Sequence, residues 1–121
     1  MRNYRDLQVW QKAHGLTLAL YKATLCFPVE ERYGLTTQIR RACSSILANL
    51  AEGCGRQSDR EMGRFVQIAM GSGAELSYHL QLARDLKPLG PDEYSMLDAE
   101  LNSIMRMLSA LAGKLRRIEA A

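Results

Sequence analysis

The feature that most constrains the fold of this chain is an apolar repeat over residues 94–118. A helix with one apolar seam buries that seam against other helices, so the repeat predicts an all-α protein. Its side chains recur in alternating steps of three and four residues, which places them along the seam of a helical bundle or coiled coil. The repeat consists of Tyr94, Leu97, Leu101, Ile104, Leu108, Leu111, Leu115 and Ile118.

Start and stop signals predict three further helices upstream, over residues 3–26, 35–52 and 58–86. Asn3 can cap the first helix, and Phe27-Pro28 ends it because the residue before proline avoids the α region. The second helix ends at Gly53-Cys54-Gly55, and Ser58 with Glu61 forms a capping box that opens the third. Gly90-Pro91 begins the fourth helix, which carries the apolar seam.

Short connections favour antiparallel neighbours, so we predict an antiparallel up-down-up-down four-helix bundle, with one domain over residues 1–121. The run Gly71-Ser72-Gly73 would allow a close backbone approach between the second and third helices. The predicted core face of the third helix consists of Met62, Phe65, Ala69, Ser72, Leu76, Leu80 and Ala83.

Composition narrows the class of protein. The chain is 47% hydrophobic and 24% charged, as in an ordinary globular protein, and no stretch approaches the roughly 18 apolar residues of a membrane span. The N-terminus has no signal-peptide core. The three cysteines form no C-x-x-C pair and are predicted to be reduced and structural. We therefore expect a cytoplasmic protein without a membrane partner, metal or cofactor.

Catalytic chemistry is hard to assemble from this sequence. The two histidines, His14 and His79, lie on different predicted helices, and such residues are more often flank residues than general bases. We find no Glu-x-x-His pair, no phosphate-binding loop and no nucleophile motif. The sequence therefore predicts a protein that binds and assembles and is not an enzyme.

A polar stripe accompanies the apolar face of the second helix. Three interpretations are open: a solvated face, a semi-buried hydrogen-bond network that fixes register or a subunit contact, or a ligand site. Antiparallel pairing would bring Gln38 level with Glu75, Arg41 with Ser72, and Asn49 with Arg64. The predicted structural polar network consists of Gln38, Arg41, Ser45, Asn49, Glu52, Ser72 and Glu75.

Basic residues form two groups in a chain whose net charge is +3. Arginine suits phosphate because its planar fork donates two hydrogen bonds at once, so both groups are candidate nucleic-acid contacts. The alternative is a solubilising surface with ion pairs to Asp59 and Glu61. Aromatic residues do not interleave with these arginines in the sequence, which favours contacts to shape or backbone over base stacking. The predicted contacts are Arg40, Arg56, Arg60 and Arg64, and then Lys114, Arg116 and Arg117.

Four segments resemble the four-helix-bundle proteins encoded in bacterial 23S rRNA intervening sequences. They are YRDLQVWQKA at residues 4–13, Phe27-Pro28, YGLTTQIRRA at 33–42 and SILANLAEGCGR at 45–56. The third-helix run GSGAEL at 71–76 is also similar to the motif of that family. The similarity covers nearly the whole chain.

The resemblance implies a bundle assembled as a ring, typically a homopentamer. It also implies kinship with accessory proteins of diversity-generating retroelements, which are basic pentameric barrels that bind nucleic acid. We therefore expect a homo-oligomer that binds RNA or DNA. The alternatives are a protein–protein scaffold that binds a partner protein and, third, an enzyme with a pocket at a subunit boundary.

Overall fold

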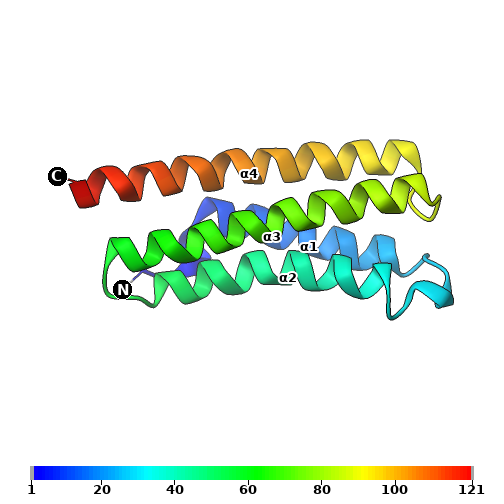
Figure 1. The fold of residues 1–121 in the computed structure, drawn as a ribbon, viewed down its shortest axis with the longest axis horizontal. Helices are drawn as coiled ribbons and strands as arrows, with labels where there is room; N and C mark the ends of the chain where they lie inside the picture. Colours follow the sequence, from blue (N-terminus) through cyan, green and yellow to red (C-terminus); the bar gives the residue numbers. More distant parts are fainter. Residues whose placement is uncertain (1, 121) are drawn as a thin grey trace.

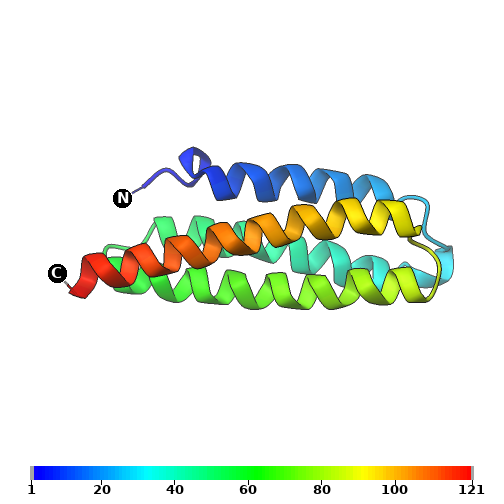
Figure 2. The same cartoon turned by 90° about the horizontal axis from the view of Figure 1, so that it is seen from above.

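The four predicted helices are present in the computed structural model, which describes residues 2–120. Successive helices run antiparallel, and α4 also packs beside α1, which closes the bundle (Figures 1 and 2). The predicted fold class is therefore confirmed. The helices are α1 (Gln8–Thr24), α2 (Leu35–Cys54), α3 (Asp59–Asp85) and α4 (Pro91–Ala120), with short 3-10 turns η1 (Tyr4–Asp6) and η2 (Val29–Glu31).

The start of the first helix differs from the prediction. Asn3 caps the short turn η1 and not α1, since its Oδ1 accepts the backbone N–H of Arg5 at 3.0 Å. Leu7 then has an extended backbone, with φ −72° and ψ 125°, and α1 begins only at Gln8. The cap signal at Asn3 was real, but a single extended residue separates the turn that it caps from the helix.

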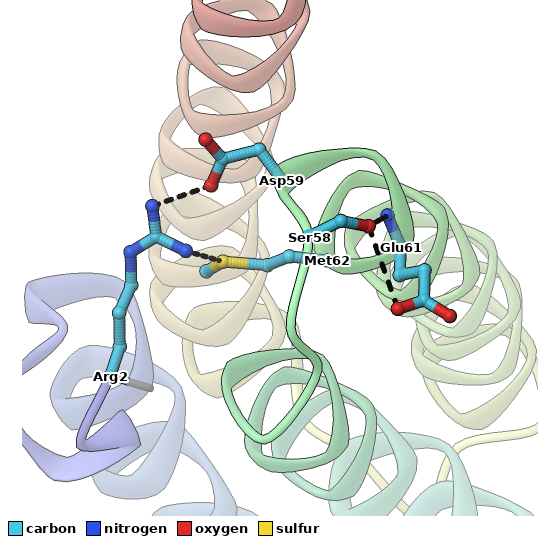
Figure 3. Close-up of polar contacts among 5 residues, drawn as sticks. All are labelled: Arg2, Ser58, Asp59, Glu61 and Met62. Carbon is cyan, nitrogen blue, oxygen red and sulfur yellow. Dashed lines mark hydrogen bonds and ion pairs between the residues drawn. The ribbon is translucent and has the colours of Figure 1, made fainter.

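The starts of α3 and α4 agree with the sequence signals. The Ser58 hydroxyl accepts the backbone N–H of Glu61 at 3.1 Å, as expected of a helix N-cap (Figure 3). Helix α4 begins at Pro91, where a missing N–H removes no helical hydrogen bond. Helix α2 continues two residues beyond its predicted end, to Cys54.

The buried stripe of α4 departs from the predicted seam at its C-terminal end. Ala112 is buried, whereas Leu111 is half-buried and Ile118 is exposed. The buried positions repeat every 3.6 residues, as in a straight helix, and a repeat of 3.5 drifts off that stripe over several turns. On α3, likewise, Val66 is buried and Phe65 is only half-buried. Across residues 2–120, no helix combines the length and apolarity needed to cross a membrane.

Helix α1 is much shorter than α4. The ion pair between Lys12 Nζ and Glu100 Oε1, 2.9 Å apart, shows which residues of the two antiparallel helices lie level. Helix α1 begins only four residues before Lys12, so the last turns of α4 continue past it alongside α3 (Figure 2). The end of the bundle that holds the α2–α3 turn is therefore more open than the opposite end.

Close approach between helices α2 and α3 occurs at Gly53. A Cβ added there would lie 3.0 Å from Phe65 Cβ and 3.4 Å from the Met62 carbonyl oxygen. The run at residues 71–73 does not have its predicted role. A Cβ on Gly73 would collide with the Met105 sulfur on α4, and one on Gly71 would meet no atom within 4 Å. The reason is rotation about the helix axis, which turns Gly73 toward α4 and Gly71 toward solvent.

We expect Gly53→Ala and Gly71→Ala to change the free energy of unfolding in opposite directions. Alanine favours helix by up to about 1 kcal/mol over glycine, so Gly71→Ala should stabilise the protein by roughly 0.5–1 kcal/mol. At Gly53 the new methyl group meets atoms fixed to α3, and overpacking should lower the stability by about 1–2 kcal/mol. Urea unfolding of the two variants tests this prediction. Equal shifts would contradict the close approach at Gly53.

The cysteines occupy different environments. Cys43 and Cys54 are buried, Cys26 is exposed, and all three are free. Burial raises the pKa of the Cys43 thiol. Burial also raises the pKa of Cys54, although the Arg2 guanidinium partly opposes that shift. Since the thiolate is the reactive form, the two buried thiols are packing groups, in agreement with the sequence.

Candidate nucleic-acid interface

The net charge of the protein is concentrated at one end of the bundle. We call this the α2–α3 end and define it as residues 2–7, 51–66 and 113–120, which lie together in Figure 1. Eight basic and five acidic residues lie in these segments, a net charge of +3, and the rest of the chain holds eight of each sign. The basic residues at this end are Arg2, Arg5, Arg56, Arg60, Arg64, Lys114, Arg116 and Arg117.

Arg2 fastens the N-terminal segment to this end. Its backbone N–H donates to the Cys54 carbonyl at 3.3 Å. Its guanidinium donates to Asp59 Oδ1 at 2.7 Å and contacts the Met62 sulfur at 2.8 Å (Figure 3). Asp59 is thereby neutralised by a neighbouring cation, which leaves the arginines of α3 to set the local potential.

A groove between α3 and α4 joins the two basic groups that the sequence kept apart. Arg60 and Arg64 lie one turn apart on α3, and Arg116 faces the same groove from α4. The antiparallel pairing of the two long helices causes this meeting. The groove has a volume of about 270 Å³. Its lining consists of Asp59, Arg60, Gly63, Arg64, Gln67, Ala112, Leu115, Arg116 and Glu119.

The arginine side chains of the groove are only weakly engaged by acids. Arg60 is 84% exposed, and its Nε lies 3.9 Å from Glu119 Oε1, a distance at which an exposed ion pair contributes little. Among the described residues, no ion pair to Arg64 or Arg116 occurs. The groove therefore presents guanidinium groups that can accept a new anionic partner.

An aromatic ring accompanies the arginines, contrary to the sequence-based interpretation. The guanidinium carbon of Arg56 lies 4.8 Å from the centroid of the Phe65 ring, and that of Arg64 lies 5.8 Å from it. Arg56 also donates from Nη2 to Glu52 Oε1 at 2.6 Å, one turn earlier in α2. The ring was missed because it was assigned to the core, whereas it is half-buried at the helix surface.

The other predicted phosphate contacts divide into two cases. Lys114 and Arg117 are exposed on the last turns of α4, at the same end as the groove. Arg40 lies sixteen residues before Arg56, about 24 Å away along α2. Its Nε donates to Thr24 Oγ1 at 2.9 Å and its Nη2 to the Tyr21 carbonyl at 3.1 Å. Arg40 thus ties α2 to α1 and is not part of the basic end.

Part of the predicted polar stripe forms a hydrogen-bond chain between α2 and α3. Asn49 Nδ2 donates to the Ser45 carbonyl at 2.8 Å and to the Ser45 hydroxyl at 3.1 Å. The Ser45 and Ser72 hydroxyl oxygens are 2.8 Å apart, and Ser72 donates to the Ile68 carbonyl at 3.3 Å. This chain is half-buried and links the two helices at one register.

That register differs by about one turn from the predicted pairing. Ser72 bonds Ser45 and not Arg41, and Ser45 lies four residues, or about one turn, further along the same face of α2. Gln38 and Glu75, which the alignment placed level with each other, do line one small hollow of about 150 Å³, together with Arg41 and Ser45. Glu52 lies apart from this hollow, exposed and paired with Arg56. The predicted stripe therefore divides into three parts: a hydrogen-bonded chain, a small hollow and an ion pair at the surface.

Sequence comparison places this chain in a family. The family model for the 23S rRNA-intervening sequence protein matches residues 5–110, which is most of the chain. The chain belongs to this family. The resemblance seen in the sequence motifs is thus confirmed, and no curated protein matches the chain.

A solved structure has the same fold. It is described as a protein with unknown function from the S23 ribosomal protein family of Bacteroides thetaiotaomicron. The two chains are 21% identical and superpose with a TM-score of 0.77, over 86% of this chain and 97% of the other. The arginine on the α4 side of the groove, Arg116, lies beyond residues 5–110 that the 23S rRNA-intervening sequence protein model matches.

Two groove residues on α3, Gly63 and Gln67, were missed at the sequence level. They share one face of α3 with Arg60, which was predicted, as steps of three and four residues require. Antiparallel pairing about the connection at residues 86–90 would have placed Arg60 level with Arg116. The predicted topology therefore contained the signal for the pairing of Arg60 with Arg116. Leu115 was already in the predicted seam, whereas Ala112 follows only from the observed period of the buried stripe.

Proposed function

We propose that this protein binds RNA, or another nucleic acid, through the α2–α3 end, and that it assembles as a homo-oligomer without catalysing a reaction. The observation that supports binding most directly is the location of the whole net charge of +3 at that end. A cytoplasmic location is part of the proposal, since an RNA partner is found there.

Phosphate is the ligand chemistry that the basic end suits best. Arg60, Arg64 and Arg116 surround one groove, and each guanidinium can donate two hydrogen bonds to a phosphodiester. Assembly would repeat this surface in each copy, and repeated weak contacts on one strand raise the overall affinity. The charge is unlike that of a general solubilising surface, because the rest of the chain, outside the α2–α3 end, has a net charge of zero.

Electrophoretic retardation of a structured RNA at increasing salt tests the proposal. Three phosphate contacts predict a loss of affinity of roughly 20- to 40-fold between 50 and 200 mM salt, since each contact releases condensed counterions. Binding that is independent of salt would reject contacts to phosphate. Failure to retard RNA or DNA at micromolar protein and low salt would reject nucleic-acid binding as a whole.

Exposed apolar side chains support the proposed assembly. Leu18 and Tyr21 on α1 and Leu25 directly after it are 58%, 41% and 75% exposed, and their spacing of three and four residues places them on one face. A contact with another copy would remove this face from water. The family resemblance implies five copies, and light scattering would then give about 68 kDa, five times the chain mass of 13.6 kDa. A mass of one chain at micromolar concentration would contradict assembly.

A protein–protein scaffold is the second candidate function. Val29 and Tyr33, 73% and 87% exposed, lie in the α1–α2 connection, at the end of the bundle opposite to the basic groove. Apolar groups there could meet a partner protein, and the arginines could meet an acidic surface. Capture of a protein by the purified chain, without co-purifying nucleic acid in its absorbance spectrum, would favour this function over RNA binding.

A further inference from the structure

We propose that the α3–α4 groove receives the base of an unpaired nucleotide while its arginines hold the flanking phosphates. This inference rests on the proposed nucleic-acid binding and specifies the form of the nucleic acid. It also revises the sequence-based expectation of contacts to shape and backbone alone. The ligand is a single-stranded or looped segment, and not a continuous duplex.

The floor of the groove is apolar. Gly63, Ala112 and Leu115 form it, and Ala112 and Leu115 are almost fully buried. An apolar floor contributes nothing to the binding of phosphate, because phosphate contacts need only charge and hydrogen-bond donors. A nucleobase has flat apolar faces that this floor can cover.

The groove can admit a base. The groove has a volume of about 270 Å³ and is open to solvent along one side, so a planar base can enter it. The opposing arginines of α3 and α4 line the two sides of this space. A base that remains paired inside a duplex cannot reach the floor, so only an unpaired or flipped-out base can occupy it.

The walls supply the polar partners that a nucleotide needs. Arg60 and Arg64 on one wall and Arg116 on the other can hold the phosphates before and after the base. The Gln67 amide can donate to and accept from a base edge, and Glu119 can accept from an exocyclic amino group. A carboxylate in the groove would repel a ligand made only of phosphate. Beside a base, the same carboxylate can accept a hydrogen bond.

The nearby aromatic ring extends the same surface. Phe65 lies under the guanidinium groups of Arg56 and Arg64, at the edge of the α2–α3 end. Guanidinium planes held in this way are stacking platforms for unpaired bases. A strand leaving the groove past Arg64 would therefore meet a second surface suited to bases.

Gly63→Leu tests the inference because it fills the groove without removing a charge. A Cβ at Gly63 has Leu115 Cβ at 3.9 Å as its nearest neighbour, so the backbone can accept a side chain there. Gly71→Leu is the matched control, the same change on the same helix at a site with no atom within 4 Å. The probes are an unstructured 20-nucleotide RNA and a blunt 20-base-pair RNA duplex, each measured by fluorescence anisotropy.

We expect the wild-type protein to bind the single strand more tightly than the duplex. Gly63→Leu should lower single-strand affinity about 5- to 10-fold, leave duplex affinity unchanged, and abolish the fluorescence change of a 2-aminopurine base in the strand. Gly71→Leu should change none of these. If Gly63→Leu fails to fold by circular dichroism, Gly63→Ala provides a smaller filling with a smaller loss.

The outcomes separate this inference from the proposed function. Unchanged single-strand affinity in Gly63→Leu, or an equal loss for strand and duplex, would overturn the base pocket while RNA binding stands. Absence of binding to both probes by the wild-type protein would overturn the proposed function and the base pocket with it. Tighter binding to the duplex than to the strand would also reject the unpaired base.

Discussion

Replacing Arg60, Arg64 and Arg116 together by glutamine is expected to lower RNA affinity roughly 100-fold at moderate salt. The three guanidinium groups face one groove from two helices, and no ion pair to Arg64 or Arg116 occurs in the described part of the chain. If each contributes about 1 kcal/mol through a charge-assisted hydrogen bond, the loss is about 3 kcal/mol, or two factors of ten. The salt dependence of the remaining binding should also be weaker, because three phosphate contacts are gone.

A control triple variant separates groove contacts from net charge. Lys22 is in the last turn of α1, Arg32 follows η2 in the α1–α2 connection, and Lys87 is in the α3–α4 connection, so all three lie toward the opposite end of the bundle. They are exposed, and their replacement by glutamine removes the same number of charges. We expect this control to lose less than about 5-fold in affinity, since charges beyond a Debye length of roughly 10 Å are screened. Equal losses in both variants would show that net charge and not the groove governs binding. Circular dichroism spectra confirm that both variants fold.

Leu101→Ala is expected to lower the free energy of unfolding by about 3–5 kcal/mol. Leu101 lies in the buried stripe of α4 and is fully buried, with an exposed fraction of 0%. Its truncation removes apolar contacts and leaves a cavity that rigid helices cannot close. For a domain of this length, such a loss corresponds to a melting temperature on the order of 10 °C lower, or more. Urea unfolding at fixed protein concentration measures the change.

Leu86→Ala is the matched control for this prediction. Leu86 follows the end of α3 and is 57% exposed, so the same truncation should change the stability by less than about 0.5 kcal/mol. A small loss at Leu101, comparable with that at Leu86, would mean that the seam of α4 is not part of the core. A changed denaturant slope, the m-value, would point to an altered unfolded state and not to a cavity.

The helices themselves were well predicted because their signals are local. The cap at Ser58, the proline at residue 91 and the glycines after α2 act through the backbone within a turn of each helix end. Local signals also produced the error at the first helix, where Asn3 caps a separate turn and Leu7 interrupts the helix. Nothing in the pattern of residues 3–8 distinguishes one continuous helix from a capped turn followed by a helix.

Relations between helices were predicted less well. The polar stripe on α2 was recognised, but its partner on α3 was off by about one turn, since Ser72 bonds Ser45 and not Arg41. Helix rotation depends on how all the side chains of an interface interlock, and a small rotation changes which residues face each other. The alignment also did not show that Gly53, and not Gly71, lies at the close approach of α2 and α3.

The sequence by itself determined the family, the four helices and the antiparallel order, because periodicity, caps and short connections are local properties of the chain. Only the tertiary structure decided the groove. Arg60 and Arg116 are far apart in sequence and meet because α3 and α4 pair antiparallel, while the shorter α1 leaves their shared end open. Likewise, Arg40 was separated from the other arginines by distance along α2 and by its bonds to α1. The sequence gives the charge and type of each residue, but the packing of the helices decides which charges share a surface.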